Sequence, residues 1–430
     1  MASISVLGGG VSGVTTATAL SLLGHDVELY TDRRADHAYG SHVPMMASLY
    51  PAASVIPHSV TVDDPAAHLA ESQALFDVLR RAPRFGVRRQ LHFEMFEPEA
   101  VSTVTDPAYA PGLARYARCE IRARPERPSP ALSAPMPPLR PGAARADGWR
   151  FDATFVETPV YLRALFDLFE GIGGTIKTVH VTADRLRKLP GDAFVNALGG
   201  TARDVFPDPR PSSYLRGVLL LVDSPGLPAH VQTGAPVSYN YTPDPAVYAQ
   251  ADGSAAGVYA YPRRDVWVLG GSKQAGTIEA GKWVGPSITG DTRLVPGLDD
   301  SPPVEVPEPV IHLNDQLLQG LTGASIRGRD MRATFGYRFA RDLDGEGVRF
   351  GCTEAPDGRP VAHNTGHGGA GVTLSWSSAL RVAQTLHDAL GLSATGPAAA
   401  PAISGPPVAA PLTRALRQRL ATLGDDAPPR

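Results

Sequence analysis

Cysteine is scarce in this 430-residue chain, which has only Cys119 and Cys352, far apart in sequence. So small a number excludes a disulfide framework and a cysteine-rich metal site, and it is typical of a reducing cytoplasm. The formal net charge is only −3, so no global basic field points to nucleic acid or an anionic membrane. No apolar run reaches the roughly 20 residues of a membrane span. The apolar N-terminus also lacks the basic segment of a secretory signal. We therefore expect a cytoplasmic protein with no bound metal and no nucleic-acid or membrane partner.

Proline and glycine are abundant by comparison, with 41 and 44 residues, and they are unevenly spread. A dense stretch at residues 125–141 and an Ala/Pro-rich stretch at residues 394–411 cannot bury enough apolar surface to form a core. We interpret the first as a surface insertion and the second as a linker. Leucines then recur at helical spacing and predict a short amphipathic helix; they are Leu412, Leu416, Leu420 and Leu423. We favour docking of this helix on its own chain, with a homodimer contact as the alternative.

The first forty residues have the order strand, glycine turn, helix, strand. Residues 3–7 are a short apolar strand, residues 14–23 carry an apolar helical face, and residues 26–30 form a second strand. Such a turn holds the pyrophosphate of a dinucleotide against free N–H groups at the positive end of the helix. The predicted binding residues of the turn are Gly8, Gly10, Val11, Ser12 and Gly13.

The residue types in this turn suit that chemistry. Gly8 allows the tight turn, Gly10 lets the backbone approach the phosphates, and Gly13 lets the helix pack closely on the strand. Asp32 follows the second strand and can accept hydrogen bonds from ribose hydroxyls. Its carboxylate would repel the 2′-phosphate of NADP. The motif therefore predicts a dinucleotide other than NADP, and it does not separate NAD from FAD.

A second glycine-rich turn, at residues 363–373, opens a helix near the other end of the chain. The helix carries an apolar stripe at Val372, Trp376, Ala379, Ala383, Leu386 and Leu390. Its N-terminus offers N–H donors and positive potential, which would stabilise the negative charge of a reduced flavin. An NAD dehydrogenase has no comparable need there, so this turn favours FAD. We interpret His367, inside the turn, as a packed and hydrogen-bonded histidine rather than a flavin contact.

The two glycine turns and residues 30–33 together resemble the D-amino acid oxidase family of flavoproteins. Other stretches match in the same order over residues 3–390, namely residues 147–149, 195–199, 215–218, 258–263, 268–271 and 336–341. The chain also departs from the family pattern. Val218 replaces the glutamine of an R-G-Q strand, and Phe339 replaces the proline of a G-x-R-P-x-R strand. Met45 and Met46 stand where small residues are common.

The resemblance implies a substrate site built on Arg338 and Tyr259. A planar guanidinium at Arg338 would bind the substrate carboxylate bidentately, and the Tyr259 hydroxyl would support the same group. The family also draws a second tyrosine from a lid loop. Tyr239, Tyr241 and Tyr248 all lie in the irregular stretch expected before Tyr259, and the sequence does not choose among them.

The resemblance also implies the cofactor contacts outside the first turn. These are Asp32, Arg33, Ser41, His42, Ala47, Ser48, Val181, Gly336, Gly368, Gly369, Ala370, Gly371, Val372 and Thr373.

The expected fold is α/β, with a Rossmann-like FAD-binding domain and an interleaved mixed-sheet α+β substrate domain. FAD-binding segments are expected at residues 1–60, 151–215 and 336–392. Substrate-domain segments are expected at residues 61–150 and 216–335, the first with the proline-rich insertion and the second with the lid. Residues 393–430 would hold the linker and the short helix.

The resemblance implies an FAD-dependent oxidase that takes hydride from the α-carbon of a D-amino acid or a similar amino acid. Dioxygen would accept the electrons and give hydrogen peroxide, and the imino acid would hydrolyse to a keto acid and ammonia. The alternative is a tailoring amine or imino-acid oxidase of a specialised-metabolite pathway, since the Ala, Pro, Arg and Gly usage suggests a GC-rich bacterial genome. A flavin-binding protein without turnover and an NAD-dependent dehydrogenase are the remaining hypotheses.

Overall fold

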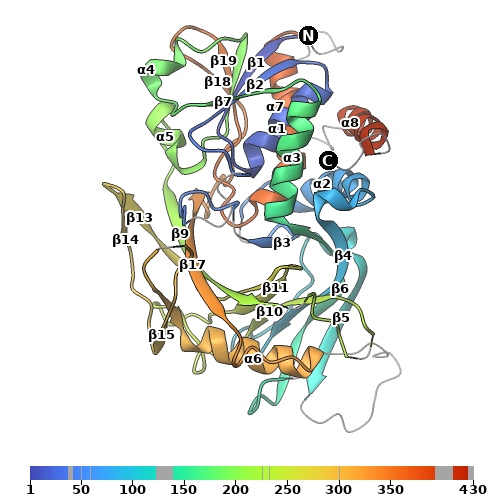
Figure 1. Cartoon of the computed structure of the whole chain (residues 1–430), viewed down its shortest axis with the longest axis vertical. Helices are drawn as coiled ribbons and strands as arrows, with labels where there is room; N and C mark the ends of the chain where they lie inside the picture. The colour runs from blue at the N-terminus through green and yellow to red at the C-terminus, as the bar shows by residue number, and fades with distance from the viewer. Residues whose placement is uncertain are drawn as a thin grey trace.

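The computed structural model describes residues 1–36, 42–49, 51–58, 60–122, 139–224, 226–231, 233–299, 301–392 and 410–424. The expected linker lies outside these ranges apart from its last two residues, and so does most of the expected proline-rich insertion. The structure has two bodies that lie end to end along its long axis, and each is built on its own sheet (Figure 1). We call them the upper and the lower body after their positions in Figure 1. No helix in the described ranges is both long and apolar enough to cross a membrane.

The upper body is a six-stranded sheet that is parallel except at one edge. In order across the sheet, its strands are β18 (Cys352–Glu354), β19 (Pro360–His363), β8 (Ala193–Asn196), β1 (Ser3–Leu7), β2 (Asp26–Thr31) and β7 (Thr175–Thr178). They come from three separated parts of the chain, so the N-terminal strands lie beside strands from its middle and its far end. Parallel neighbours require crossover connections. A single helix joins β1 to β2, whereas the chain between the other parallel neighbours passes through strands of the second sheet.

Helices cover both faces of this sheet (Figure 1). One face packs against α1 (Val11–Leu22), α3 (Thr158–Gly171) and α7 (Gly371–Ala389), which share a core with the inward residues of β1 and β2. The short helices α4 (Ala183–Leu186) and α5 (Ala202–Val205) contribute to a separate core on the other face. This layered arrangement is the Rossmann-like body that the sequence predicts.

The lower body is an eleven-stranded mixed sheet. In order, its strands are β14 (Lys282–Val284), β13 (Gln274–Glu279), β9 (Ser212–Asp223), β12 (Val266–Gly270), β11 (Val258–Pro262), β10 (Val237–Thr242), β4 (Val87–Phe96), β6 (Arg145–Glu157) and β3 (Ala52–Ser54). In addition, β17 (Met331–Arg341) pairs with β9, and β5 (Ala114–Arg122) pairs with β6. The face away from the upper body is covered by α6 (Glu308–Thr322) (Figure 1). A small pair, β15 (Thr292–Val295) and β16 (Val304–Pro307), adjoins it.

The last helix docks on its own chain. α8 (Ala410–Gly424) packs against α2 (Pro65–Leu79) and α1, and its Leu416 and Leu420 side chains are buried. The Arg84 guanidinium donates a hydrogen bond to the carbonyl oxygen of Leu423 at 3.2 Å. The leucine spacing therefore predicted a helix that is present, and its apolar stripe packs on the upper body of the same chain, as we favoured.

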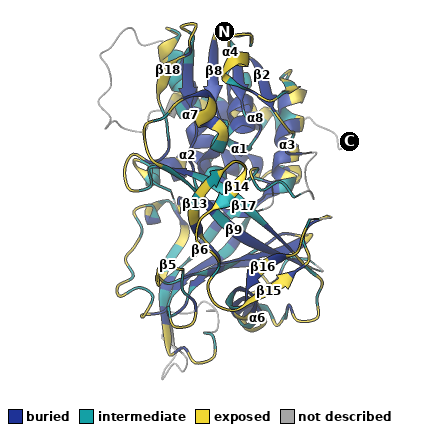
Figure 2. Ribbon diagram, turned by 90° about the vertical axis from the view of Figure 1, so that its left-hand side faces the viewer, coloured by how far each residue is buried: buried dark blue, intermediate teal, exposed yellow. Residues whose placement is uncertain are grey.

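The helix after the first glycine turn begins earlier than its apolar pattern suggests. The pattern places it at residues 14–23, whereas α1 starts at Val11. Its first turn includes Gly13, a residue that contributes nothing to an apolar stripe and that disfavours helix on propensity alone. Burial of that turn between β1 and the neighbouring helices outweighs the local preference, and Figure 2 shows α1 buried along its length. The predicted boundaries after residues 150, 215 and 335 fall inside β6, β9 and β17.

Candidate functional site

The first glycine turn is packed so closely that three of its glycines have no room for a side chain. A Cβ atom added to Gly9 would lie 2.5 Å from Oγ1 of Thr31. Gly8 has φ +112°, and a Cβ atom added there would lie 2.2 Å from the carbonyl oxygen of Ala197 on the neighbouring segment. A Cβ atom on Gly13 would lie 1.8 Å from the carbonyl oxygen of Gly8. Gly10 differs, because a Cβ atom there would meet only the Ser48 hydroxyl, at 3.7 Å. The turn is therefore closed toward the protein at those three glycines and open at Gly10.

The N-terminus of α1 begins at this open position. Gly10 is its N-cap and provides no side-chain acceptor, and the first turn contains no acidic residue. The N–H of Val11 donates to the Ser48 hydroxyl at 3.3 Å. The N–H groups of Ser12 and Gly13 have no acceptor within the helix, since the first turn of any helix leaves its donors unpaired. Such an end carries partial positive charge and suits an anionic group.

Asp32 lies just past the end of β2, beside Arg33, and both side chains are exposed. Among the described residues, the Asp32 carboxylate has no hydrogen-bond or ion-pair partner. On the opposite face of the sheet, Val181 is buried in the same apolar cluster as Leu7 and Tyr30. A free carboxylate and a buried valine thus flank the carboxyl end of β2, where a ribose and an adenine would lie in a Rossmann-like body.

The second glycine turn meets the first in space, although about 360 residues separate them in the sequence. Gly371 is the first residue of α7, and a Cβ atom added to it would lie 3.6 Å from Cγ1 of Val11, the first residue of α1. Two helix N-termini therefore converge. As in α1, the first turn of α7 has no acidic residue and no side-chain cap. The N–H groups of Gly371, Val372 and Thr373 lack intrahelical acceptors for the same reason as those of α1. The two N-termini together form one electropositive region.

Backbone contacts fasten this second turn to the large sheet. The N–H of Gly368 donates to the carbonyl oxygen of Phe339 in β17 at 2.9 Å, and His367 forms a bridge with Ala340. Burial lowers the pKa of His367 to about 4, so its ring is neutral at physiological pH. Its Nε2 atom is buried and has no partner in the described part of the chain. The ring is packed as expected, but at Nε2 the expectation of a hydrogen-bonded histidine was wrong.

A loop at residues 42–49 contacts both α1 and β17. The N–H of Tyr337 in β17 donates to the carbonyl oxygen of Pro44 at 2.8 Å. Gly336 faces the loop, and a Cβ atom there would lie 4.0 Å from Cα of Ala47. Nδ1 of His42 lies 3.1 Å from the Thr334 hydroxyl. The predicted contacts His42, Ala47, Ser48 and Gly336 are thus gathered between α1 and β17, whereas Ser41 lies outside the described residues.

The guanidinium of Arg338 lies over a glycine on the neighbouring strand. A Cβ atom on Gly217 would be 2.8 Å from Nη2 of Arg338, and Nε of Arg338 lies 3.5 Å from the carbonyl oxygen of Leu215. No carboxylate among the described residues forms an ion pair with Arg338. Arg341, on the same strand, is by contrast paired with Asp208 at 2.7 Å. Arg338 therefore has the features of a ligand-binding arginine rather than those of a structural ion pair.

Tyr259 lies near Arg338 on β11. It pairs with Gly270 of β12, whose missing side chain makes room for the phenol, since a Cβ atom there would lie 2.2 Å from the Tyr259 oxygen. Burial raises the pKa of Tyr259, and the positive charge of Arg338 partly opposes that rise. The hydroxyl is therefore protonated and can donate a hydrogen bond.

The expectation that three tyrosines share an irregular lid stretch was wrong for two of them. Tyr239 and Tyr241 lie in β10 and are buried against α6, on the face away from the upper body. The Tyr239 hydroxyl donates to Oδ1 of Asn314 at 2.8 Å, and that of Tyr241 bonds to Glu97. Tyr248 does lie in the loop before β11, where it lines a cavity and donates to the carbonyl oxygen of Gly271 at 3.1 Å. Tyr239 and Tyr241 are two residues apart in β10, so their side chains point to the same face of the sheet.

Sequence reasoning also missed Lys273, which follows Gly270 and Gly271. The residue is exposed overall, but partial desolvation of its ammonium together with repulsion from Arg338 lowers its pKa. A basic residue after an L-G-G stretch was the only signal, and nothing local distinguishes it from a surface lysine. Groups of three or more His, Cys, Asp or Glu side chains that could hold a metal do not occur in the described ranges.

The fold and the two converging helix N-termini define a dinucleotide-binding oxidoreductase. The family model described as FAD dependent oxidoreductase (DAO) matches residues 3–385. The chain belongs to this family, and FAD is its cofactor. The hypothesis of an NAD-dependent dehydrogenase was therefore wrong, and the choice of FAD from the second glycine turn is confirmed.

Curated relatives cover most of the chain. A D-amino-acid oxidase from Rubrobacter xylanophilus is 27% identical over 377 residues, which are 87% of this chain and 92% of that protein. A D-amino-acid oxidase from Streptomyces coelicolor is 28% identical over 386 residues, covering 89% and 95%.

Among solved structures, glycine oxidase from Geobacillus kaustophilus matches with a TM-score of 0.56 at 16% identity and covers 90% of this chain and 95% of its own. NikD, an amino acid oxidase of nikkomycin biosynthesis, matches with a TM-score of 0.56 at 14% identity and covers 90% and 94%. At these identities the likeness is one of fold.

Proposed function

We propose that the protein is an oxidase that removes hydride from the α-carbon of a D-amino acid or a closely similar amino acid. The observation that carries this proposal is the position of Arg338, a guanidinium without a described acid partner on the strand that holds the second glycine turn. A carboxylate is the natural ligand of such a group, because the guanidinium offers it two parallel hydrogen bonds.

We assign FAD to the region where the N-termini of α1 and α7 converge. The residues present fit its parts. The open face of Gly10 accepts the pyrophosphate close to the backbone, and Asp32 is free to accept from ribose hydroxyls. The dipole at the N-terminus of α7 would stabilise negative charge on a reduced flavin bound there. The remaining contacts are assigned to Arg33, His42, Ala47, Ser48, Val181, Gly336 and residues 368–373.

The bound cofactor supplies a hydride acceptor and, once reduced, a source of electrons for dioxygen. The chain's own residues orient the substrate. Arg338 fixes the carboxylate, and the protonated Tyr259 hydroxyl donates a further hydrogen bond to it. With the carboxylate fixed, the α-hydrogen of the neutral amine substrate would be directed toward the proposed flavin site. Orientation governs this step, so no dedicated general base is required. The products are an imino acid, which hydrolyses to a keto acid and ammonia, and hydrogen peroxide.

Hydrogen peroxide release across a panel of D-amino acids, L-amino acids and N-methyl amines tests this function. Bleaching of the flavin without oxygen separates substrate oxidation from the choice of acceptor. We expect D-amino acids to release peroxide and to bleach the flavin. Bleaching without peroxide release would show that the electron acceptor is not dioxygen. A preference for L-amino acids would show that the proposed stereochemistry is wrong.

A second candidate is a tailoring oxidase that acts on an amine or imino acid of a specialised pathway. A departure on the substrate side favours it: Met45 is 44% exposed on the loop facing β17. A bulky residue there alters the wall that a substrate meets. Phe339 points to the opposite face of β17 from Arg338 and packs on Tyr214. If no amino acid on the panel bleaches the flavin, this candidate replaces the first. We also propose a cytoplasmic location, with a homodimer as the open question for the assembly.

A further inference from the structure

Lys273 and Arg338 emerge on the same face of the large sheet. β17 pairs with β9 so that Arg338 lies opposite Leu215. β13 pairs with the other edge of β9, with Gln274 opposite Arg216, and continuing this register by one residue places Lys273 opposite Gly217. Leu215 and Gly217 share a face because residues two apart in a strand point the same way. The two basic side chains therefore approach Gly217 from its two sides.

Gly217 leaves the space between them free. A Cβ atom there would lie 2.8 Å from Nη2 of Arg338 and 3.4 Å from the carbonyl oxygen of Ser272, the residue before Lys273. The absence of a side chain at this position makes room for the Arg338 guanidinium. The charge of Lys273 lies near enough to Arg338 for the two cations to repel each other.

Neither cation is neutralised by a described carboxylate. On β17, by contrast, Arg341 is paired with Asp208 at 2.7 Å and Arg332 with Asp223 at 3.3 Å. Arg216 of β9 forms no ion pair with a described carboxylate either, but its guanidinium lies over the rings of Phe335 and Trp283. The repulsion from Arg338 contributes to the lowered pKa of Lys273. Two unpaired like charges side by side are unfavourable, and an anionic ligand between them removes the repulsion.

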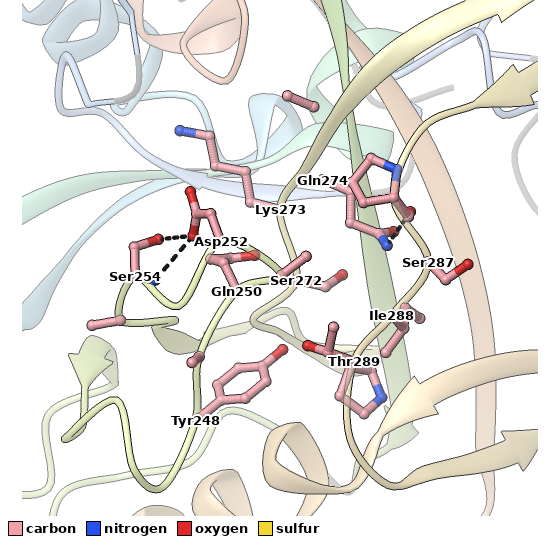
Figure 3. A pocket seen from close by; sticks show the side chains of 16 residues that line it. Tyr248, Gln250, Asp252, Ser254, Ser272, Lys273, Gln274, Ser287, Ile288 and Thr289 are labelled. Carbon is pink, nitrogen blue, oxygen red and sulfur yellow. Dashed lines mark hydrogen bonds between the residues drawn. The ribbon is translucent and has the colours of Figure 1, made fainter.

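A cavity of about 410 Å³ with both polar and apolar side chains in its wall adjoins Lys273. Figure 3 shows Lys273 extending away from Gln274, in agreement with their alternation along the chain. The Gln274 amide lines the cavity and donates to the carbonyl oxygen of Pro286 at 2.8 Å, while its Oε1 atom is buried with no partner among the described residues. Asp252, the acid on the cavity wall, is bonded to Ser254 at 2.6 Å. There is thus space beside Lys273, and Asp252, the acidic side chain in its wall, is held by Ser254 and forms no ion pair with Lys273.

We propose that Lys273 binds a second acidic group of the substrate, so that the preferred substrate is an amino or imino dicarboxylic acid. Arg338 holds the carboxylate next to the reacting carbon, and Lys273 holds the distal one. This inference rests on the proposed function and specifies its substrate class. It makes Lys273 a specificity-determining residue.

Calorimetric titration of the FAD-loaded protein tests the proposal without turnover. Glutarate and pentanoate have equal carbon numbers and differ by one carboxylate. We expect glutarate to bind about 10- to 100-fold more tightly, as a charge-assisted hydrogen bond would give. Lys273→Met should remove this difference, Lys273→Arg should retain most of it, and Lys282→Met, a matched change at an exposed lysine of β14, should leave it intact.

Kinetics provide the second readout. For the wild type, kcat/KM for D-glutamate should exceed that for D-glutamine by about tenfold or more, and Lys273→Met should lower only the value for D-glutamate. Equal binding of glutarate and pentanoate, or equal losses for both substrates in Lys273→Met, would overturn the proposal. If glutarate is preferred through Lys273 but no amino acid is oxidised, the proposed oxidase function fails and the dicarboxylate site stands.

Discussion

The N–H of Gly368 donates a hydrogen bond to the carbonyl oxygen of Phe339 at 2.9 Å. Phe339 follows Arg338 in β17, and Gly368 begins the approach to α7. This backbone hydrogen bond thus joins β17, which carries Arg338, to the second glycine turn, which we propose to lie at the flavin. Because both partners are main-chain atoms, the spacing of substrate and cofactor depends little on side-chain motion.

Replacing Gly10 should impair cofactor binding while leaving the fold intact. A side chain at Gly10 has room in the protein, since only the Ser48 hydroxyl is near, but it would occupy the proposed path of the pyrophosphate. We expect Gly10→Val to weaken FAD binding by at least about tenfold, or 1.4 kcal/mol. Titration of apoprotein with FAD measures this, with circular dichroism to verify the fold. Gly171→Ala, at an exposed site with no atom in the way, is the control.

Arg338→Met should reduce kcat/KM for a carboxylate substrate by roughly 100-fold or more. The change removes a bidentate charge-assisted interaction, in which each hydrogen bond to a charged group contributes about 1.5–3 kcal/mol. Arg332→Met is the matched control, because Arg332 lies in the same strand but forms an exposed ion pair with Asp223. Similar losses in both variants would show that the effect comes from the strand rather than from the guanidinium.

Tyr259→Phe should raise KM for the same substrate by about tenfold with little change in kcat, since it removes one hydrogen bond that forms before and during the reaction. Burial raises the pKa of this hydroxyl, so the difference in KM between the wild type and Tyr259→Phe should persist through neutral and mildly alkaline pH. Steady-state kinetics between pH 6 and about 9 would measure both parameters. A fall in kcat with unchanged KM would assign Tyr259 to the reaction step instead.

Acid should destabilise the fold through its buried histidines. Burial, with help from Arg349 and Arg341, lowers the pKa of His363 to about 3 in the folded protein. Its Nδ1 lies 3.0 Å from the Asn196 amide and its Nε2 lies 2.9 Å from the Thr353 hydroxyl, an arrangement that needs a neutral ring. The unfolded chain binds a proton near pH 6.5, so this contribution is complete above that pH and decreases as pH falls toward 3.

Urea unfolding of the protein at pH 7, 6 and 5 measures this loss. The slope per histidine approaches about 1.4 kcal/mol per pH unit below pH 6.5. His363→Gln should reduce the slope by about that amount, whereas His312→Gln, at an exposed position of α6, should leave it unchanged. Identical slopes for all three proteins would show that His363 does not contribute to the pH dependence of stability.

Sequence patterns predicted the parts of this protein that depend on local order. The strand, turn and helix at Gly8 to Gly13, and the second turn before α7, can be read from glycine spacing because backbone geometry demands glycine there. The resemblance then placed Arg338 and Tyr259 on strands. What could not be predicted depends on pairing between distant strands. Tyr239 and Tyr241 face α6 because β10 extends through them, and Lys273 borders the site only because β13 and β17 flank the same strand.

The convergence of Val11 and Gly371 is a further result that no local pattern contains. Each glycine turn alone indicates a helix end suited to an anion. Only the parallel sheet, which draws strands from both ends of the chain, brings the two ends together. The same limit applies to Gly217, whose role is to leave space for Arg338.

The central claim is that Arg338 positions a carboxylate-bearing amine for oxidation at the bound flavin. Anaerobic mixing of the FAD-loaded protein with D-amino acids, followed through the flavin absorbance, tests it most directly. We predict rapid bleaching of the wild type and of Arg332→Met, and bleaching roughly 100-fold slower or weaker in Arg338→Met at the same substrate concentration. Equal bleaching of Arg338→Met and the wild type by a carboxylate substrate would contradict the account.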